Sequence, residues 1–104
     1  MRIALAQINP TVGDITGNLR KHLDALAAAR AQNAHVVLFP ELSILGYPPK
    51  DLLLKPAVLA LAREAVLRIA EATRDTGMTA LVGYAEKSAA PAGRPLRNAV
   101  AILR

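Results

Sequence analysis

The sequence predicts an α/β fold in which two helices pack on a mostly parallel sheet of about four strands. Short apolar runs alternate with longer segments of helical periodicity, which is the pattern of consecutive strand–helix–strand units. Hydrophobic residues make up 53% of the 104 residues, but the aromatic ones are only two tyrosines and one phenylalanine. The core must therefore be built from aliphatic side chains. The chain has no cysteine, which excludes a disulfide scaffold, a zinc finger and a cysteine nucleophile within these residues.

The first strand is predicted over residues 2–8, a nearly continuous apolar run that Asn9-Pro10 ends. An unbroken run of this length is typical of a strand that is buried on both faces. A helix follows, with Asp14 or Thr16 as its N-cap and Asn33 at its end. Its predicted apolar stripe consists of Ile15, Leu19, Leu23, Leu26 and Ala27.

The second strand is predicted over residues 35–39 and ends at Pro40, because proline cannot donate to a ladder. Residues 40–55 show no clean period but are rich in leucine and isoleucine, which indicates a packed loop of the kind that is often functional. The remaining elements are a helix over about residues 56–76, a strand over 79–85, a loop over 87–95 and a strand over 98–103. We expect the first three strands to be parallel, since helices connect them.

The chain carries a formal charge of +5, which raises the question of a nucleic-acid partner. The basic residues are scattered, however, and Arg20-Lys21 is their longest run, so we expect a solvated basic surface and no nucleic acid. The N-terminus lacks the layout of a signal peptide, and no apolar run approaches the ~20 residues of a membrane span. We therefore expect a cytoplasmic protein without a membrane partner.

Glu41 is the strongest candidate for chemistry because it lies two residues past the second predicted strand, where α/β sheets form their sites. Apolar neighbours such as Phe39 and Leu42 should partly desolvate its carboxyl group. Desolvation favours the protonated form and makes a carboxylate a usable general base near neutral pH. Position alone leaves a second role open, in which Glu41 caps a helix or pairs with Lys50.

The other candidates carry weaker signals. Ser43 lies outside any nucleophile elbow, and no histidine is near it in sequence, which argues against a serine nucleophile. His22 and His35 lack metal-ligand spacing, and we expect His22, which lies off the apolar stripe, on the solvated surface. The six glycines form no phosphate-binding loop. We therefore expect no metal and no cofactor to bind within these residues.

Two segments resemble the nitrilase superfamily of carbon–nitrogen hydrolases: Ile-Ala-Leu-Ala-Gln-Ile-Asn-Pro at 3–10 and Val-Val-Leu-Phe-Pro-Glu-Leu at 36–42. Asn-Ala-Val-Ala at 98–101 resembles the strand that precedes the family's catalytic lysine, although Arg97 stands where an aromatic residue is common.

Further motifs narrow the resemblance to one branch of the superfamily. Asn-Pro-Thr-Val-Gly-Asp at 9–14, with Gly17-Asn18, is similar to the glutaminase domains of bacterial NAD synthetases. Residues 46–54, from Gly-Tyr-Pro-Pro to Leu-Leu-Leu, are similar to the same domains. The likeness runs along essentially the whole chain.

The resemblance implies a Glu-Lys-Cys triad on a four-layer αββα sandwich, of which this chain would supply about half. Glu41 matches the glutamate, which acts as general base and later activates the hydrolytic water. The lysine that stabilises the oxyanion and the cysteine nucleophile would lie beyond Arg104, where the last strand stops without a cap or tail. Tyr47 would help to shape the glutamine pocket, although a role as a packed loop anchor remains open.

The resemblance therefore implies that residues 1–104 are the N-terminal part of a glutaminase domain, inactive by themselves and belonging to a homo-oligomer. The parent enzyme would hydrolyse L-glutamine and pass ammonia to a further domain. That domain, with ATP and Mg²⁺, would amidate nicotinic acid adenine dinucleotide to NAD. Two alternatives remain open: a non-enzymatic truncated module or subunit that pairs with a partner chain, and another nitrilase-type amidase with a different substrate.

Overall fold

The computed structural model describes residues 1–49, 51–52, 55–87 and 96–104. Two helices and four strands follow one another along these residues: β1 (Ile3–Leu5), α1 (Ile15–Ala31), β2 (Val36–Leu38), α2 (Pro56–Thr73), β3 (Thr79–Lys87) and β4 (Leu96–Leu103). Almost all of the loop predicted over 87–95 lies outside the described residues, as do Lys50, Leu53 and Leu54 of the loop predicted over 40–55.

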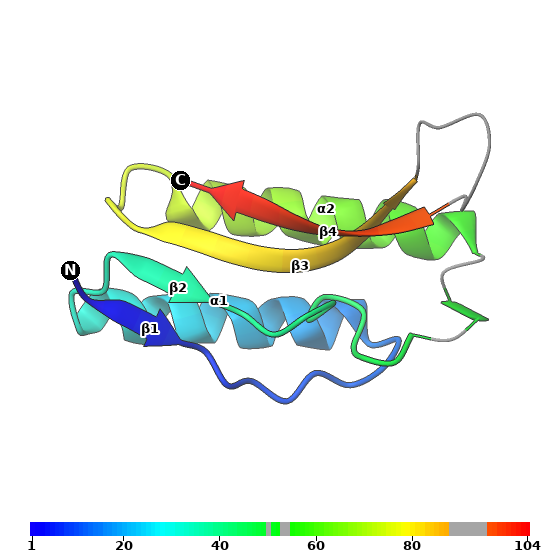
Figure 1. Cartoon of the computed structure of the whole chain (residues 1–104), viewed down its shortest axis with the longest axis horizontal. Coiled ribbons are helices and arrows are strands. Elements are labelled where there is room, and N and C mark those ends of the chain that lie inside the picture. The colour runs from blue at the N-terminus through cyan, green and yellow to red at the C-terminus, as the bar shows by residue number, and fades with distance from the viewer. Residues whose placement is uncertain (50, 53–54, 88–95) are drawn as a thin grey trace.

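The four strands form one sheet in the order β1-β2-β3-β4 (Figure 1). β1 pairs with β2 and β2 pairs with β3, both in parallel. β4 pairs with β3 in the antiparallel direction, from Ala80↔Leu103 at one end to Lys87↔Leu96 at the other. The predicted α/β class and the parallel arrangement of the first three strands are thus confirmed.

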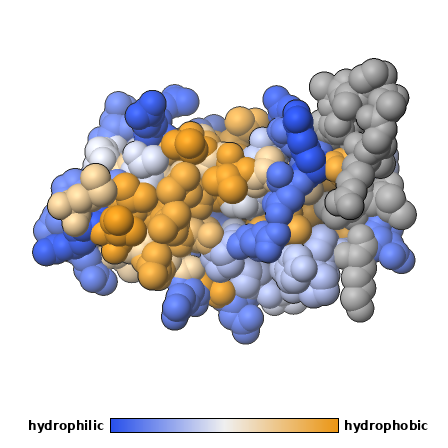
Figure 2. Space-filling view, viewed as in Figure 1, coloured by the Kyte–Doolittle hydropathy of each residue, from blue (hydrophilic) through white to orange (hydrophobic). Residues whose placement is uncertain are grey.

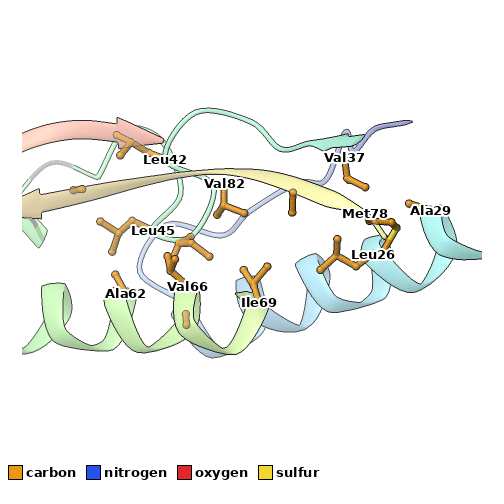
Figure 3. Close-up of a cluster of buried hydrophobic side chains, with 14 of the residues drawn as sticks. Leu26, Ala29, Val37, Leu42, Leu45, Ala62, Val66, Ile69, Met78 and Val82 are labelled. Atoms are coloured by element: carbon orange, nitrogen blue, oxygen red, sulfur yellow. The ribbon is translucent and has the colours of Figure 1, made fainter. Parts of the chain in front are cut away.

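Both helices cover the same face of the sheet, so the molecule has two layers (Figure 1). Side chains from β3 and α2, such as Val82 and Ile69, point toward one another in the core between the layers (Figure 3). Apart from Met78, all the buried hydrophobic residues are leucine, isoleucine, valine or alanine, and Phe39 and Tyr84 are only partly buried beside them. The predicted aliphatic core is therefore confirmed for the described residues.

The helices begin and end at residues whose side chains or backbone angles favour a helix end. The side chain of Asp14 caps α1, with its Oδ1 accepting from the backbone N–H of Gly17 at 3.0 Å. Beyond the end of α1, Asn33 adopts a left-handed backbone with φ 59°, which stops the helix. Pro56 occupies the first turn of α2, where its missing N–H costs nothing.

The second face of the sheet is uncovered, which corrects the prediction that the first strand is buried on both sides. Ile3 is 55% and Leu5 67% exposed. Their neighbours across the sheet complete an apolar surface that we call the bare sheet face, which consists of Ile3, Leu5, Leu38, Val100 and Ile102 (Figure 2). A continuous apolar run shows that a strand avoids water in its final environment, but it does not show that the same chain covers both faces.

Among the described helices, none is both long and apolar enough to span a bilayer.

Candidate active site

Glu41 lies in the turn that follows β2, at the carboxyl end of the parallel strands, as the sequence analysis predicts. Its side chain is exposed, so the expected desolvation is absent in the part of the chain that the structure describes. The residue after it, Leu42, has a left-handed backbone with φ 48°. This conformation is unusual for leucine, and it lets the chain reverse so that Leu42 turns inward while Glu41 stays at the surface.

Apolar side chains hold this turn against the core. Ile44 and Leu45 are completely buried, and Leu42 is 6% exposed. In Figure 3, Leu45 lies between β3 and α2, and Leu42 lies beside β3 toward the same end of the core as Ala62. The prediction that this loop is packed is therefore confirmed for its described part, and buried side chains anchor the turn that carries Glu41.

The turn also lies directly on β3, and Gly83 makes this close approach possible. A Cβ atom at Gly83 would lie 2.6 Å from the backbone nitrogen of Leu42 and 3.2 Å from the carbonyl oxygen of Pro40. The first distance is far inside van der Waals contact, and both neighbours are backbone atoms that no side-chain rotation can move. The position of Glu41 therefore depends on the missing side chain of Gly83.

A buried polar network attaches the same turn to α1. The neutral His22 ring donates from Nδ1 to the carbonyl oxygen of Asn18 at 2.7 Å and accepts at Nε2 from the Ser43 hydroxyl at 2.7 Å. The Asn18 amide in turn donates to the carbonyl oxygens of Ile44 and Thr11, at 2.8 and 2.9 Å. Three fully buried polar side chains thus fix the turn that carries Glu41 relative to the first helix.

The expected surface position of His22 is wrong, since the residue is fully buried and its ring packs against Phe39 with centroids 4.4 Å apart. The core-facing stripe of α1 includes Asn18, His22, Leu26 and Ala29, which are spaced by four, four and three residues. The signal was therefore present as a helical repeat. It was missed because two members of the stripe are polar.

The contact between Ser43 and His22 does not make a nucleophile. Both side chains have no exposed surface, and neither lines the groove beside Glu41, so a substrate cannot reach the serine hydroxyl. The contact is a structural one in which buried polar groups satisfy each other.

We expect His22 to make the stability of the protein depend on pH. Burial lowers the pKa of His22 below its ordinary value of 6.5, while the unfolded chain takes up a proton near 6.5. Below this pH the unfolded state binds more protons than the folded state. The contribution of neutral His22 to the free energy of unfolding is therefore complete above pH 6.5 and is lost as the pH falls.

Thermal unfolding at pH 7 and pH 5 should show a larger drop in Tm for the wild type than for His22→Gln. Equal drops would contradict the assignment, and His35→Gln, at an exposed histidine, is the control.

Asn98 is the residue that the structure brings to Glu41 from far along the chain. Its Nδ2 donates to Oε1 of Glu41 at 2.5 Å, across 57 positions of sequence. A groove opens beside this pair. It is lined by Leu38, Phe39, Pro40, Glu41, Leu81, Gly83, Asn98, Ala99 and Val100. Glu41 thus lines the groove while Oε1 of its carboxylate accepts from Asn98.

Arg97 and Glu86 lie on facing positions of β4 and β3, next to the pair formed by Asn98 and Ala85. Nε of Arg97 donates to Oε1 of Glu86 at 2.9 Å, and the Tyr84 hydroxyl donates to Oε2 at 2.8 Å. The Tyr84 hydroxyl, assisted by the charge of Arg97, holds the pKa of Glu86 below its usual value. Arg97 thus links the two strands beside Asn98.

Tyr47 is 65% exposed and follows Gly46, whose backbone N–H donates to the carbonyl oxygen of Leu42 at 2.9 Å. It is not among the described residues that line the groove beside Glu41. The structure therefore brings Asn98 to Glu41 but does not bring Tyr47 to them. Within the described residues, no cluster of three or more histidine, cysteine, aspartate or glutamate side chains could hold a metal ion.

Comparison with known proteins gives a consistent result along the whole chain. The family model for carbon–nitrogen hydrolases matches residues 2–104. A glutamine-dependent NAD(+) synthetase of Xanthomonas campestris pv. campestris is 47% identical over 100% of this chain. The chain spans only 18% of the length of that protein.

Two solved structures show the same arrangement. The chain is similar to a glutamine-dependent NAD(+) synthetase from Cytophaga hutchinsonii, with a TM-score of 0.87 and 30% identity over 99% of this chain and 17% of that one. It is also similar to an amidase from Nesterenkonia sp. AN1, with a TM-score of 0.77 and 28% identity over 100% of this chain and 41% of that one. In that amidase structure a glutamate is replaced by leucine, and the active-site cysteine carries an acetamide group.

Proposed function

Because the chain belongs to the carbon–nitrogen hydrolase family, we propose that it is the N-terminal part of a glutaminase domain whose ammonia is used to make NAD. The observation that carries the proposal is the likeness to glutamine-dependent NAD(+) synthetases over the full length of the chain. The matched region spans the positions of Glu41, Gly83 and Asn98. The chain resembles the amidase less closely, at a TM-score of 0.77 against 0.87, so a different amide substrate is the less favoured choice.

In the proposed reaction Glu41 moves protons for a cysteine that the remainder of the protein supplies. Its carboxylate takes the thiol proton as the sulfur attacks the amide carbon, and a lysine, also outside these residues, stabilises the oxyanion. Glu41 then gives the proton to the departing nitrogen, which leaves as ammonia. In the second half it takes a proton from water, the hydroxide displaces the thiolate from the acyl group, and the proton returns to sulfur.

The bare sheet face supports the proposal that residues 1–104 are one portion of a larger domain. It exposes five large apolar side chains on a single surface, and such a surface is normally covered by other polypeptide. Polypeptide on this face would also lie beside the groove, since Leu38 and Val100 belong to both. Covering the groove would remove water from Glu41 and supply the desolvation that these residues lack.

The proposal extends to the partners of the parent protein. L-glutamine is the substrate of this domain, and ATP with Mg²⁺ belongs to a separate synthetase domain that uses the ammonia. The parent protein is cytoplasmic and assembles as a homo-oligomer.

Isotope transfer tests the proposed function directly. The full-length protein that carries these residues is incubated with nicotinic acid adenine dinucleotide, ATP, Mg²⁺ and glutamine labelled with ¹⁵N at its side-chain amide. We expect one labelled NAD for each glutamate released, because the ammonia passes from one reaction to the other. If glutamine stays intact while a simple aliphatic amide is hydrolysed, the protein is instead an amidase of different specificity.

A further inference from the structure

We propose that Asn98 is a positioning residue for Glu41: it holds one carboxylate oxygen so that the other faces the groove. The inference rests on the proposed function, because it concerns the general base of the same reaction. The contact itself is direct, with Nδ2 of Asn98 at 2.5 Å from Oε1 of Glu41.

The placement of Asn98 on β4 indicates a specific partner. Side chains of this strand alternate, and Asn98, Val100 and Ile102 are exposed while Ala99, Ala101 and Leu103 turn toward the helices. Asn98 therefore shares a face with two large apolar residues. A polar amide does not contribute to an apolar surface of this kind. Its side-chain contact is with the carboxylate oxygen Oε1 of Glu41.

The backbone around Asn98 is well fixed, as a positioning residue requires. Asn98 faces Ala85 in the antiparallel ladder, and the next pair along it, Arg97 with Glu86, is joined by an ion pair of 2.9 Å. On the other side of the contact, the turn that carries Glu41 packs closely on Gly83 of β3. The buried network of Asn18, His22 and Ser43 attaches the same turn to α1. Two separate parts of the fold, the turn after β2 and strand β4, thus meet at this hydrogen bond.

The neutral amide suits a base that must both take and return a proton. A donor to the ionised carboxylate favours that form and fixes its orientation, but an amide adds no net charge. A lysine or arginine in its place would stabilise the carboxylate so strongly that it would become a poor base. An aspartate would instead compete with Glu41 for a single proton, because two carboxyl groups at this distance cannot both ionise easily.

The test uses the full-length protein and the variants Asn98→Ala and Asn98→Asp, with glutamine hydrolysis followed from pH 5 to 9. For Asn98→Ala we expect kcat to fall about 10- to 100-fold, because the base is misoriented, with KM within about twofold of the wild type. A fall in kcat at an unchanged KM is the result expected when the base is misdirected but the substrate still binds. Asn98→Asp should lose more activity at pH 7 and regain part of it at alkaline pH, as the shared proton is lost.

Two controls separate positioning from a general structural effect. Ile102→Val changes the same face of β4 outside the groove, and we expect its kcat and pH profile to match the wild type. NAD formation from free ammonium should be unchanged in all three variants, since it does not use this site. A wild-type kcat for Asn98→Ala would overturn the inference. A fall in both the ammonium and the glutamine reactions would overturn it too, since Asn98 would then be merely structural.

A wild-type protein that hydrolyses no glutamine would instead count against the proposed function. In that case the carboxyl carbon of Glu41, labelled with ¹³C and followed by NMR, tests the contact without a substrate. Its chemical shift at neutral pH should differ between Asn98→Ala and the wild type, because the variant lacks the hydrogen bond to Oε1. Identical chemical shifts would overturn the inference.

Discussion

Replacing Glu41 with glutamine should abolish NAD formation from glutamine in the full-length protein while formation from free ammonium continues. Glutamine has nearly the same shape as glutamate and can still accept from Asn98, so the fold and the contact at 2.5 Å should persist. It cannot take the proton of a thiol, however, and the loss of a general base costs about 10²- to 10⁴-fold in rate. The measurement is the initial rate of NAD formation with each nitrogen source.

The matched control is Glu71→Gln, the same substitution at an exposed position of α2. Its rates with glutamine and with ammonium should both equal those of the wild type. If Glu41→Gln lowered both rates together, Glu41 would be a structural residue. If it lowered neither, the assignment of the base to this turn would be wrong.

The second large effect is expected at Gly83, where a single added carbon would press on the turn that carries Glu41. Its Cβ would lie 2.6 Å from the Leu42 nitrogen, so the turn must shift outward. A displacement of about 1 Å at a catalytic group can cost on the order of 10²-fold in rate. We therefore expect Gly83→Ala to lose about 10²-fold in kcat for glutamine and to be destabilised by about 1–3 kcal/mol.

Gly77→Ala provides a control for the loss of stability alone. Gly77 has φ +78°, so alanine there is strained, but no atom lies within 4 Å of the added carbon. The expected cost is about 1–2 kcal/mol, without a change in kcat for glutamine. Thermal unfolding and glutamine kinetics should be measured on both variants. If Gly83→Ala only lowered Tm, as we expect for Gly77→Ala, the close approach would have no functional role.

Local sequence patterns were sufficient for the elements of the fold. Asp14 and Pro56 mark helix starts through hydrogen bonds and φ angles that belong to a few neighbouring residues, so their roles could be predicted. Glu41 could be placed because the end of a parallel strand is a property of the topology. Strand lengths were less accurate, since β1 covers only Ile3–Leu5 of the predicted 2–8, and pairing with β2 sets that limit.

The errors and omissions arise where distant segments meet. His22 was expected at the surface because it lies off the predicted apolar stripe. Its burial depends on Ser43, 21 residues away, as the partner of Nε2. Asn98 had no visible role because its partner is 57 residues away. The exposure of Ile3 and Leu5 depends on what packs on the sheet from outside, which local apolarity does not report.

The alternation of side chains along β4 has a consequence for how the site tolerates mutation. Ala101 and Leu103 pack against the core, and Ala99 turns the same way, so two of these three inward positions hold small residues. Moving the strand by one position would press Val100 and Ile102 against the helix and would carry Asn98 away from Glu41. Ala99 and Ala101 therefore help to fix which residues of β4 face the helices and which face away. Enlarging either of them should misplace the amide without any change to the asparagine itself.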